Sequence, residues 1–466
     1  MTALETALGG ERPGVDPHPR PQFGVNVIAY ASSNVGMGIA ARHYIRLLLE
    51  RGVAVAILDV GLDYKQDSRT STYDHLAVPH ARDLPHEINL IMLNISKLPE
   101  FFLNPPDGLF RNDRMNVGLT WWELTVLPDR WIEALRLFDV VLAGSDFVRH
   151  VVEINVPGAR VVRAKHPVYL PADSIIPDRA RFGLPAQPVL FLTSFEPLSG
   201  VQRKNSFAAV VAFKRAFPDT SDLRANLVVK LNNVGDPNNV EMQHFLGLLH
   251  EECAGDPRIR VLTESLSYSD VLQLYASCDV VVSLHRSEGL GLAPLEAMRL
   301  GRPAIATAWS GNLTYMNYSN SCLVSYGFVT AGGDSHYTAK FLGRNGYWAD
   351  PDLGEAALWM RSLVDTPELR ASFAERAYAS ATAYQEDAER ASFLDELLAI
   401  WRRFDSSAQR YRHTEALRTA VRSFDQSLIT PQMRLAEAKK RISENTRRFS
   451  KRTRAALDRH LLWRFK

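Results

Sequence analysis

The segment at residues 279–307, DVVVSLHRSEGLGLAPLEAMRLGRPAIAT, limits the choice of fold more than any other part of the chain. The valines at 280–282 form a short β-branched run that is typical of a buried strand. A helix is predicted after it, because Pro294 is tolerated in a first turn and Gly301, followed by a proline, indicates a helix end. A second apolar run at 304–306 completes a β-α-β unit, which predicts a parallel sheet.

Two carboxylates occupy positions of this unit where ligands bind. Glu288 follows the carboxyl end of the first strand, where open α/β sheets bind their ligands. Glu296 lies about two turns further on, inside the helix. The backbone N–H groups around Gly291 have no intrahelical partners and form an anion site. Two carboxylates beside an anion site suit a polyol that carries a phosphate, such as a nucleotide-sugar. The structural alternative is an ordinary β-α-β unit with a solvated Glu288 and a Glu296 at a helix start.

Glu288 and Glu296 form an E-x7-E pattern within EGLGLAPLEAMRLGRP, and this segment resembles the retaining glycosyltransferases of family 4. The resemblance covers most of residues 23–400 and implies the α/β GT-B fold, in which two Rossmann-like domains face a cleft. It implies that Glu288 holds hydroxyls of the donor sugar and that Glu296 holds the ribose. The implied donor contacts between them are Gly289, Leu290, Gly291 and Leu292. The family's usual EGFG is EGLG here, with both glycines kept.

Apolar runs alternate with helical patterns along most of the chain, which predicts doubly wound sheets. The expected strands are 25–31, 53–60, 88–94, 115–120, 140–143, 163–168, 189–195, 227–231 and 259–262. Four prolines mark a linker at 171–188. The predicted parts are a disordered segment (1–22), an acceptor-side domain (23–170), the linker (171–188), a nucleotide-sugar domain (189–350), crossover helices (351–404) and a basic helical tail (405–466). A loop is expected at 326–345, and the crossover helices are expected to start near Trp348.

Arg203 and Lys204 lie just ahead of a predicted helix in the second domain. Cations at a helix start oppose the helix dipole by about 0.3–1 kcal/mol each unless an anion is bound. A diphosphate would reverse this effect, and the resemblance implies a phosphate clamp at these residues; the structural alternative is an exposed basic loop. The resemblance also assigns the nucleobase edge to the backbone of Glu264, Ser265 and Leu266.

Two further sites are predicted in the first domain. Gly36 and Gly38 form a G-x-G turn before a helix, and a simple tight turn explains them as well as a ligand does. The resemblance places this turn over the donor phosphates. Trp122 and Glu123 follow a predicted strand and are candidate contacts for the acceptor. Core packing is the alternative for the tryptophan.

The composition indicates a soluble globular protein rather than a fibrous, membrane-spanning or disulfide-linked one. The chain has 466 residues, of which 46% are hydrophobic and 23% charged. Its three cysteines form no C-x-x-C pair, which argues against a disulfide framework or a zinc site and favours a reducing compartment. No apolar run approaches the roughly 18 residues of a membrane span, and the N-terminus lacks a signal-peptide pattern. A cytoplasmic protein without a metal or other cofactor is expected.

The charge is unevenly distributed. Residues 401–466 carry 18 Lys and Arg against 6 Asp and Glu, a local charge of +12, so that residues 1–400 carry −10. Cations and terminal aromatic residues gather at 434–466, and three roles fit this segment about equally well. It could bind an anionic membrane surface, which would make the protein peripheral on the inner face, or form a solvated helix, or form a helix that pairs with another subunit. Nucleic acid is not an expected partner.

The sequence therefore predicts a retaining, metal-independent hexosyltransferase. It would move a hexose, with mannose as one candidate, from a nucleotide-diphosphate sugar to a glycan or lipid-linked acceptor in polysaccharide or glycoconjugate biosynthesis. Two alternatives remain open. One is another GT-B enzyme, either a sugar-nucleotide epimerase or a phosphorylase. The other is a non-catalytic scaffold that binds a nucleotide-sugar at a membrane.

Overall fold

Two six-stranded parallel sheets form the framework of the computed structural model, which describes residues 23–61, 69–170, 175–232, 234, 239–332, 337–405 and 414–428. The first sheet comprises β1 (Gly24–Ala29), β2 (Ala54–Asp59), β3 (Ile88–Met92), β4 (Met115–Leu119), β5 (Val140–Ala143) and β6 (Val161–Arg163). The second comprises β7 (Val189–Phe195), β8 (Ala225–Leu231), β9 (Ile259–Leu262), β10 (Val280–Ser283), β11 (Ala304–Thr307) and β12 (Cys322–Val324). The strand orders are β2-β1-β3-β4-β5-β6 and β12-β11-β10-β7-β8-β9. The predicted α/β fold with two doubly wound sheets is confirmed.

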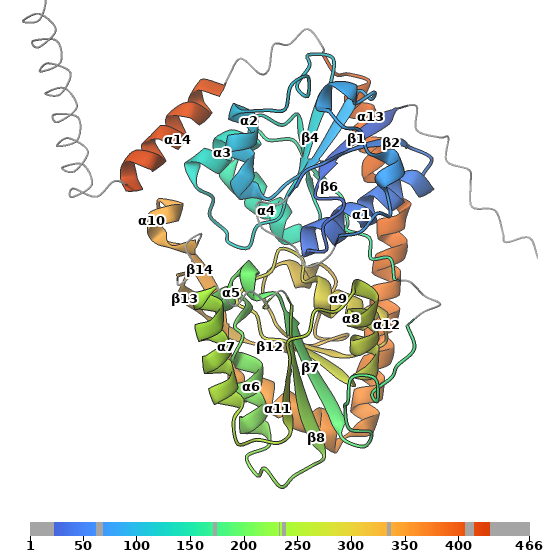
Figure 1. Cartoon of the computed structure of the whole chain (residues 1–466), viewed down its shortest axis with the longest axis vertical. Coiled ribbons are helices and arrows are strands. Elements are labelled where there is room, and N and C mark those ends of the chain that lie inside the picture. Colours follow the sequence, from blue (N-terminus) through green and yellow to red (C-terminus); the bar gives the residue numbers. More distant parts are fainter. Residues whose placement is uncertain are drawn as a thin grey trace, which may run out of the picture. The chain divides into compact units, whose positions relative to one another are not determined.

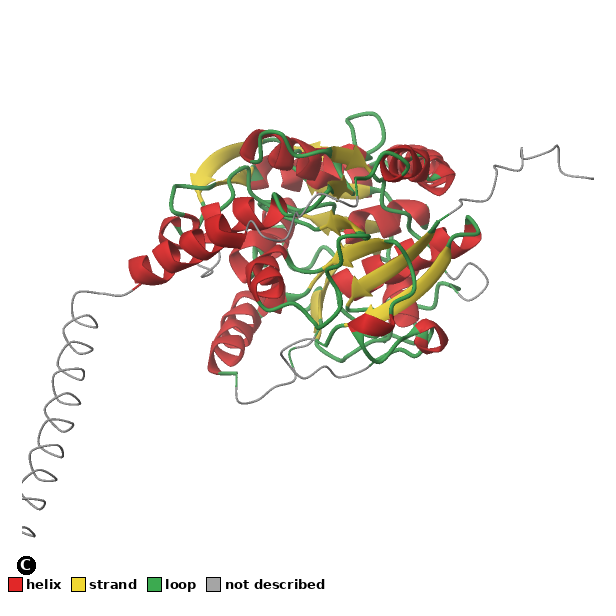
Figure 2. Ribbon diagram, turned by 90° about the horizontal axis from the view of Figure 1, so that it is seen from above, coloured by secondary structure: helices red, strands yellow, loops and turns green. Residues whose placement is uncertain are grey.

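Helices cover both faces of the first sheet, as Figures 1 and 2 show. One face packs against α1 (Gly36–Glu50) and α13 (Phe393–Trp401). The helices α2 (Leu98–Leu103), α3 (Asp129–Leu135) and α4 (Asp146–Asn155) lie on the opposite face (Figure 1). Inside the sheet, a row of buried asparagines ties three strands together, since Asn26 donates to Asn89 and Asn89 to Asn116, each at 2.9 Å. These polar pairs fix the register of β1, β3 and β4, because a slip would leave buried amides without partners.

The second sheet is covered in the same way. Its first face packs against α6 (Ala208–Ala216), α7 (Val240–Cys253) and α11 (Leu353–Asp365). Its other face packs against α8 (Tyr268–Ser277), α9 (Leu292–Arg299) and α12 (Pro367–Arg390). Parallel strands buried on both faces have nearly continuous apolar sequences, which is why VVV and AIA were recognisable as strands.

Each sheet has one point where the strand order reverses direction, and ligands of open α/β sheets bind outside the carboxyl ends of the strands at such a point. In the first sheet it lies between β1 and β3, and in the second between β7 and β10. Four loops therefore have positions suited to ligand binding, namely those after β1, β3, β7 and β10.

The last helices return to the first sheet. α12 runs for 24 residues along the second sheet, and Ala391, in the left-handed conformation at φ 52°, ends it. α13 then packs against the first sheet through Phe393, Leu394 and Leu397. Both helices fall within the segment 351–404, for which crossover helices were predicted.

Two local expectations are wrong. The strand expected at 163–168 is β6, which ends at Arg163; Pro167 has no N–H to donate to a sheet, and the chain leaves the sheet before it. The loop expected at 326–345 contains β13 (Tyr326–Thr330), which pairs antiparallel with β14 (Tyr347–Pro351), followed by α11 from Leu353. The helical region thus starts after Trp348, not at it. Each residue of β13 pairs with a residue of β14 that is 17 or more positions away, so no periodicity within a short window of sequence marks this hairpin.

Two expectations concern residues outside the described part of the chain. They are the disorder of 1–22 and the membrane-binding segment 434–466. Within the tail, α14 (Thr414–Leu428) is a helix and belongs almost entirely to a separate compact unit that begins at Glu415. In the described part of the chain, every helix is too short or too polar to cross a membrane.

We expect Gly38→Ala to destabilise the protein by about 1–3 kcal/mol, because a Cβ at this position would lie 2.1 Å from the Ser33 carbonyl oxygen and 2.8 Å from that of Tyr30. Gly36→Ala is the matched control, since a Cβ there meets no atom within 4 Å. Thermal unfolding of the two variants measures the difference. Equal stability would mean that the turn after β1 relaxes around the added methyl group.

Candidate active site

Arg203 and Lys204 lie after β7, and Glu288 lies after β10, at the reversal point of the second sheet. The two cations end α5 (Val201–Lys204), a single turn that Asn205 terminates in the left-handed conformation at φ 54°. The Asn205 amide donates to the Leu284 carbonyl at 3.0 Å. This bond joins the loop after β7 to the loop after β10, so that the cations face the carboxylate.

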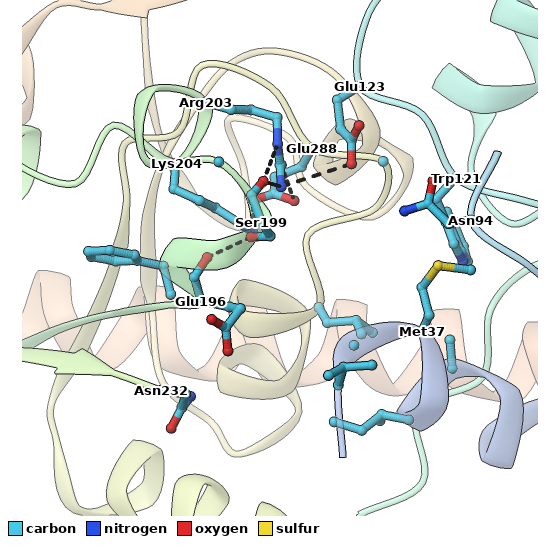
Figure 3. Close-up of a pocket in the computed structure, with 18 of the residues that line it drawn as sticks. Met37, Asn94, Trp121, Glu123, Glu196, Ser199, Arg203, Lys204, Asn232 and Glu288 are labelled. Atoms are coloured by element: carbon cyan, nitrogen blue, oxygen red, sulfur yellow. Dashed lines mark hydrogen bonds and ion pairs between the residues drawn. The ribbon is translucent and has the colours of Figure 1, made fainter. Parts of the chain in front are cut away.

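Glu288 forms ion pairs with both cations. Its Oε1 accepts from Lys204 Nζ at 2.6 Å, and its Oε2 accepts from Arg203 Nη1 at 3.2 Å (Figure 3). Burial by itself raises the pKa of Glu288, but the charges of Lys204 and Arg203 outweigh it and lower the pKa to about 2. The carboxylate is therefore ionised throughout the physiological range.

The loop that carries Glu288 is held by its backbone. The Glu288 N–H donates to Ser310 Oγ at 2.8 Å, and the Gly311 N–H donates to the Glu288 carbonyl at 2.9 Å. A Cβ on Gly311 would lie 2.2 Å from the Gly289 carbonyl oxygen, so only glycine allows this approach. Ser310 has a φ of 78°, a strained conformation for a non-glycine residue. The strain indicates that the position of this loop is enforced by its surroundings.

The start of α9 adds an anion site beside Glu288. Gly291 precedes the helix with a φ of 83°, and no side chain caps the first N–H groups. Leu292 and Ala293, which carry these groups, line the same cavity as Glu288. Uncapped N–H groups and the positive end of the helix dipole favour a negatively charged ligand here.

Glu296 lies one helix turn further in and is 4% exposed. Its Oε1 accepts a hydrogen bond from the Tyr268 hydroxyl at 2.7 Å. Burial raises the pKa of Glu296 to about 7, while the Tyr268 hydrogen bond lowers it. Near neutral pH this carboxyl group thus changes its protonation state easily.

We expect Glu296→Gln to unfold at a higher temperature than the unchanged protein at pH 8, and at nearly the same temperature at pH 4.5. The folded-state pKa of about 7 exceeds the ordinary 4.5, so the stability that this group provides is full below pH 4.5 and lost as the pH rises through 7. Glutamine cannot ionise, so the variant avoids this loss of folding free energy, which amounts to roughly 3 kcal/mol above pH 7. Tyr268→Phe is the control, since it should destabilise at pH 8. A pH-independent difference for Glu296→Gln would contradict the assignment.

The loops of the first sheet form the facing wall of the cavity, with Met37, Asn94 and Trp121 opposite the ion cluster (Figure 3). Arg42 holds the loop after β1, because its Nη1 donates to the Ala31 and Ser33 carbonyls at 3.0 and 2.7 Å. The cavity between the two walls has a volume of about 1360 Å³. This space is large enough for a nucleotide-sugar and part of an acceptor.

Most of the residues that the sequence singled out line this one cavity. They are Gly36, Trp122, Glu123, Arg203, Lys204, Ser265, Leu266, Glu288, Gly289, Leu290, Gly291, Leu292 and Glu296. Gly38 and Glu264 do not line it. Gly38 instead packs against the turn after β1, and the Glu264 carbonyl accepts from the buried Lys230 ammonium at 2.6 Å.

The two candidate acceptor contacts differ from each other. Trp122 is 4% exposed, donates to the Val126 carbonyl at 2.8 Å and packs at right angles on Trp131, which is the core packing named as the alternative. Glu123 contributes a polar side chain to the cavity wall, and its carboxylate lies 3.9 Å from the Arg203 guanidinium.

Several lining residues were not predicted from the sequence, and three of them are important for the site. Tyr268 lies two residues after the predicted nucleobase segment, and this position was a usable signal. Trp121 directly precedes the predicted Trp122 but was not itself predicted. Tyr337, whose hydroxyl donates to Glu123 at 3.2 Å, lies in a glycine-rich stretch that gave no signal.

Among the described residues, no group of three or more His, Cys, Asp or Glu side chains is placed to hold a metal ion.

Residues 204–336 match the family model described as Glycosyl transferases group 1. No curated protein matches the sequence. Among solved structures, the chain is similar to HepE of Anabaena in complex with UDP and glucose, with 14% identity and a TM-score of 0.52 over 81% of this chain and 100% of that one.

Two further structures have comparable similarity. Sucrose-phosphate synthase from Thermosynechococcus elongatus has 15% identity and a TM-score of 0.56 over 81% of this chain and 99% of that one. A glycosyltransferase from Rickettsia africae has 13% identity and a TM-score of 0.53 over 82% and 98%. These similarities establish the GT-B fold, and together with the group 1 domain at 204–336 they support a GT-B glycosyltransferase.

Proposed function

We propose that this protein transfers a hexose from a nucleoside-diphosphate sugar to a glycan or lipid-linked acceptor, with retention of the anomeric configuration and without a metal ion. The observation that carries the proposal is the placement of Glu288, Lys204 and the uncapped start of α9 around one part of the cavity. A carboxylate that can accept hydrogen bonds from sugar hydroxyls thus lies beside two positive groups that suit a diphosphate.

The donor would lie along the second sheet in this proposal. Lys204 and the N–H groups of Leu292 and Ala293 would meet the charge that builds on the leaving diphosphate. Glu288 would orient the sugar, and Glu296 would accept from the ribose hydroxyls. The backbone at Ser265 and Leu266, which line the cavity, would meet the nucleobase.

The acceptor would enter from the first sheet. The cavity wall there carries Asn94, Trp121 and Glu123, which combine hydrogen-bonding groups with an aromatic ring. Enclosure of the reacting groups between the two walls would exclude water that otherwise hydrolyses the donor.

The test is a thermal-shift screen of UDP-, GDP- and ADP-sugars followed by product analysis. Since HepE was solved with UDP and glucose, UDP-glucose is the first donor to try, with GDP-mannose beside it. A donor at about 100 times its dissociation constant adds roughly 2.7 kcal/mol of stability. Transfer to a sugar acceptor, with the product anomer identified by NMR, supports the proposal.

The same products separate the alternatives. An epimerase forms an altered nucleotide-sugar without an acceptor, and a phosphorylase consumes phosphate. Stabilisation by a nucleotide-sugar without any turnover would instead indicate a binding protein.

A further inference from the structure

Arg203 is enclosed by protein groups to a degree unusual for a residue expected to bind a ligand. Its side chain is 3% exposed. Nε and Nη2 donate to the Ser199 carbonyl at 3.3 and 2.8 Å, and Nη1 donates to the Ser287 carbonyl at 2.9 Å and to Glu288 at 3.2 Å. Nη2 also lies 3.9 Å from Glu123 Oε1. A guanidinium has five N–H groups; four of them form these hydrogen bonds, and the contact with Glu123 is a longer ion pair.

Lys204 differs from Arg203 in its exposure and in the number of its hydrogen bonds. Its side chain is 20% exposed, and its ammonium group, with three N–H donors, makes one hydrogen bond with Glu288. The neighbouring cations therefore have different surroundings. Lys204 faces the cavity, whereas Arg203 is built into its wall.

Glu123 brings a carboxylate from the first domain to this arginine. It follows β4, and its Oε2 accepts from the Tyr337 hydroxyl at 3.2 Å. Its backbone carbonyl accepts a hydrogen bond from the Ser287 hydroxyl, next to Glu288. Glu123 thus contacts three groups of the second domain, all of them around the Glu288 loop.

Tyr337 is held just as firmly. Its ring stacks on Trp122 with centroids 5.4 Å apart and contacts Trp348 at 5.2 Å. It lies in the connection between β13 and β14, which meets the first domain again where Arg344 pairs with Asp129 at 2.8 Å. The hydroxyl that fixes Glu123 is therefore anchored on both domains.

The charges explain why such a cluster is stable. Burial lowers the pKa of Arg203, but Tyr337, Glu123 and Glu288 raise it, so that the guanidinium stays charged. The charged guanidinium lies between two carboxylates, and removal of either carboxylate would leave part of its buried charge without compensation.

From these contacts we propose that Arg203 is a positioning residue and does not bind the diphosphate. In this arrangement Arg203 sets the orientation of Glu288, while Glu123, held by the Tyr337 hydroxyl, contacts Arg203 from the opposite wall of the cavity. The inference rests on the proposed function.

The experiment compares nucleotide binding with transfer in four variants of the full chain. Calorimetry with UDP, with GDP and ADP in parallel, measures binding, and product formation measures kcat and the donor KM. We expect Lys204→Met to weaken nucleoside-diphosphate binding by about 10-fold or more, the value of a charged hydrogen bond. We expect Arg203→Lys to keep that affinity within about 3-fold while kcat falls by about 100-fold, since lysine cannot make the planar set of bonds.

Glu123→Gln and Tyr337→Phe keep the inference testable if Arg203→Lys fails to fold. Each is expected to lower kcat by about 3- to 30-fold with the donor KM and nucleotide affinity unchanged. A purely structural role would instead lower the melting temperature and leave kcat per folded molecule the same.

The outcomes separate the two proposals. Equal loss of nucleotide affinity in Arg203→Lys and Lys204→Met overturns the inference and leaves the proposed function standing. So does unchanged kcat in both Glu123→Gln and Tyr337→Phe. If the unchanged protein binds none of UDP, GDP and ADP, the proposed function fails, and the inference fails with it.

Discussion

Glu288→Gln is expected to reduce transfer by about 1000-fold or more while the fold is retained. The amide cannot supply the negative charge that Lys204 and Arg203 hold in place at 2.6 and 3.2 Å, and preorganised charge is usually the largest contribution to catalysis. Nucleoside-diphosphate binding should persist or strengthen, because a negative charge next to the diphosphate is removed. Rates at saturating donor, with calorimetric titration of UDP, measure the two effects separately.

The stability of this variant should depend on pH. The pKa of Glu288 is lowered from 4.5 to about 2, so its ion pairs stabilise the fold above pH 4.5, and this contribution is lost as the pH falls through 2. Glu288→Gln should therefore be less stable than the unchanged protein at pH 7, with the difference vanishing in acid.

Glu252→Gln is the control for Glu288→Gln, since Glu252 pairs with Lys214 at 3.1 Å on the surface, outside the cavity. It should change neither transfer nor nucleotide binding. Near-normal turnover in Glu288→Gln would remove the carboxylate from the reaction and contradict the proposed function.

The second large effect is expected for Lys204→Met, which keeps the apolar stem and removes the charge. We expect the donor KM to rise by about 10- to 100-fold, since charged hydrogen bonds to phosphate contribute about 1.5–3 kcal/mol. The kcat value should fall as well, because the leaving diphosphate gains charge in the transition state. Steady-state kinetics at varied donor concentration separate the two parameters.

Lys214→Met is the matched control for this lysine, because it removes the same charge from the exposed pair with Glu252. It should leave both kinetic parameters unchanged. If Lys204→Met bound UDP as tightly as the unchanged protein, the diphosphate would have to lie elsewhere in the cavity.

Local patterns were sufficient for the framework of this protein. The valine run at 280–282 and the apolar run at 304–306 are β10 and β11, because strands buried on both faces need continuous apolar sequence. Parallel connectivity then places the residues after β7 and β10 at one edge of the sheet. That reasoning brought Lys204 and Glu288, 84 residues apart in sequence, to the same predicted site, and they lie in contact there.

The hairpin of β13 and β14 could not be found in the same way. Its strands are short, mostly exposed on β13 and separated by a glycine-rich connection, so neither alternation nor a turn motif marks them. Their pairing depends on contacts with the rest of the fold. Tyr337 was missed for this reason.

The sequence by itself determined the two doubly wound sheets and the strand ends at which charged residues gather, because burial and backbone hydrogen bonding impose local periodicities. Only the tertiary structure decided which charge is available to a ligand. Arg203 and Lys204 are adjacent and chemically alike, yet one is enclosed by Ser199, Ser287 and Glu123 and the other faces the cavity. The physical reason is that a side chain's hydrogen-bond partners come from distant segments, such as Tyr337 and Glu123, which are 214 residues apart.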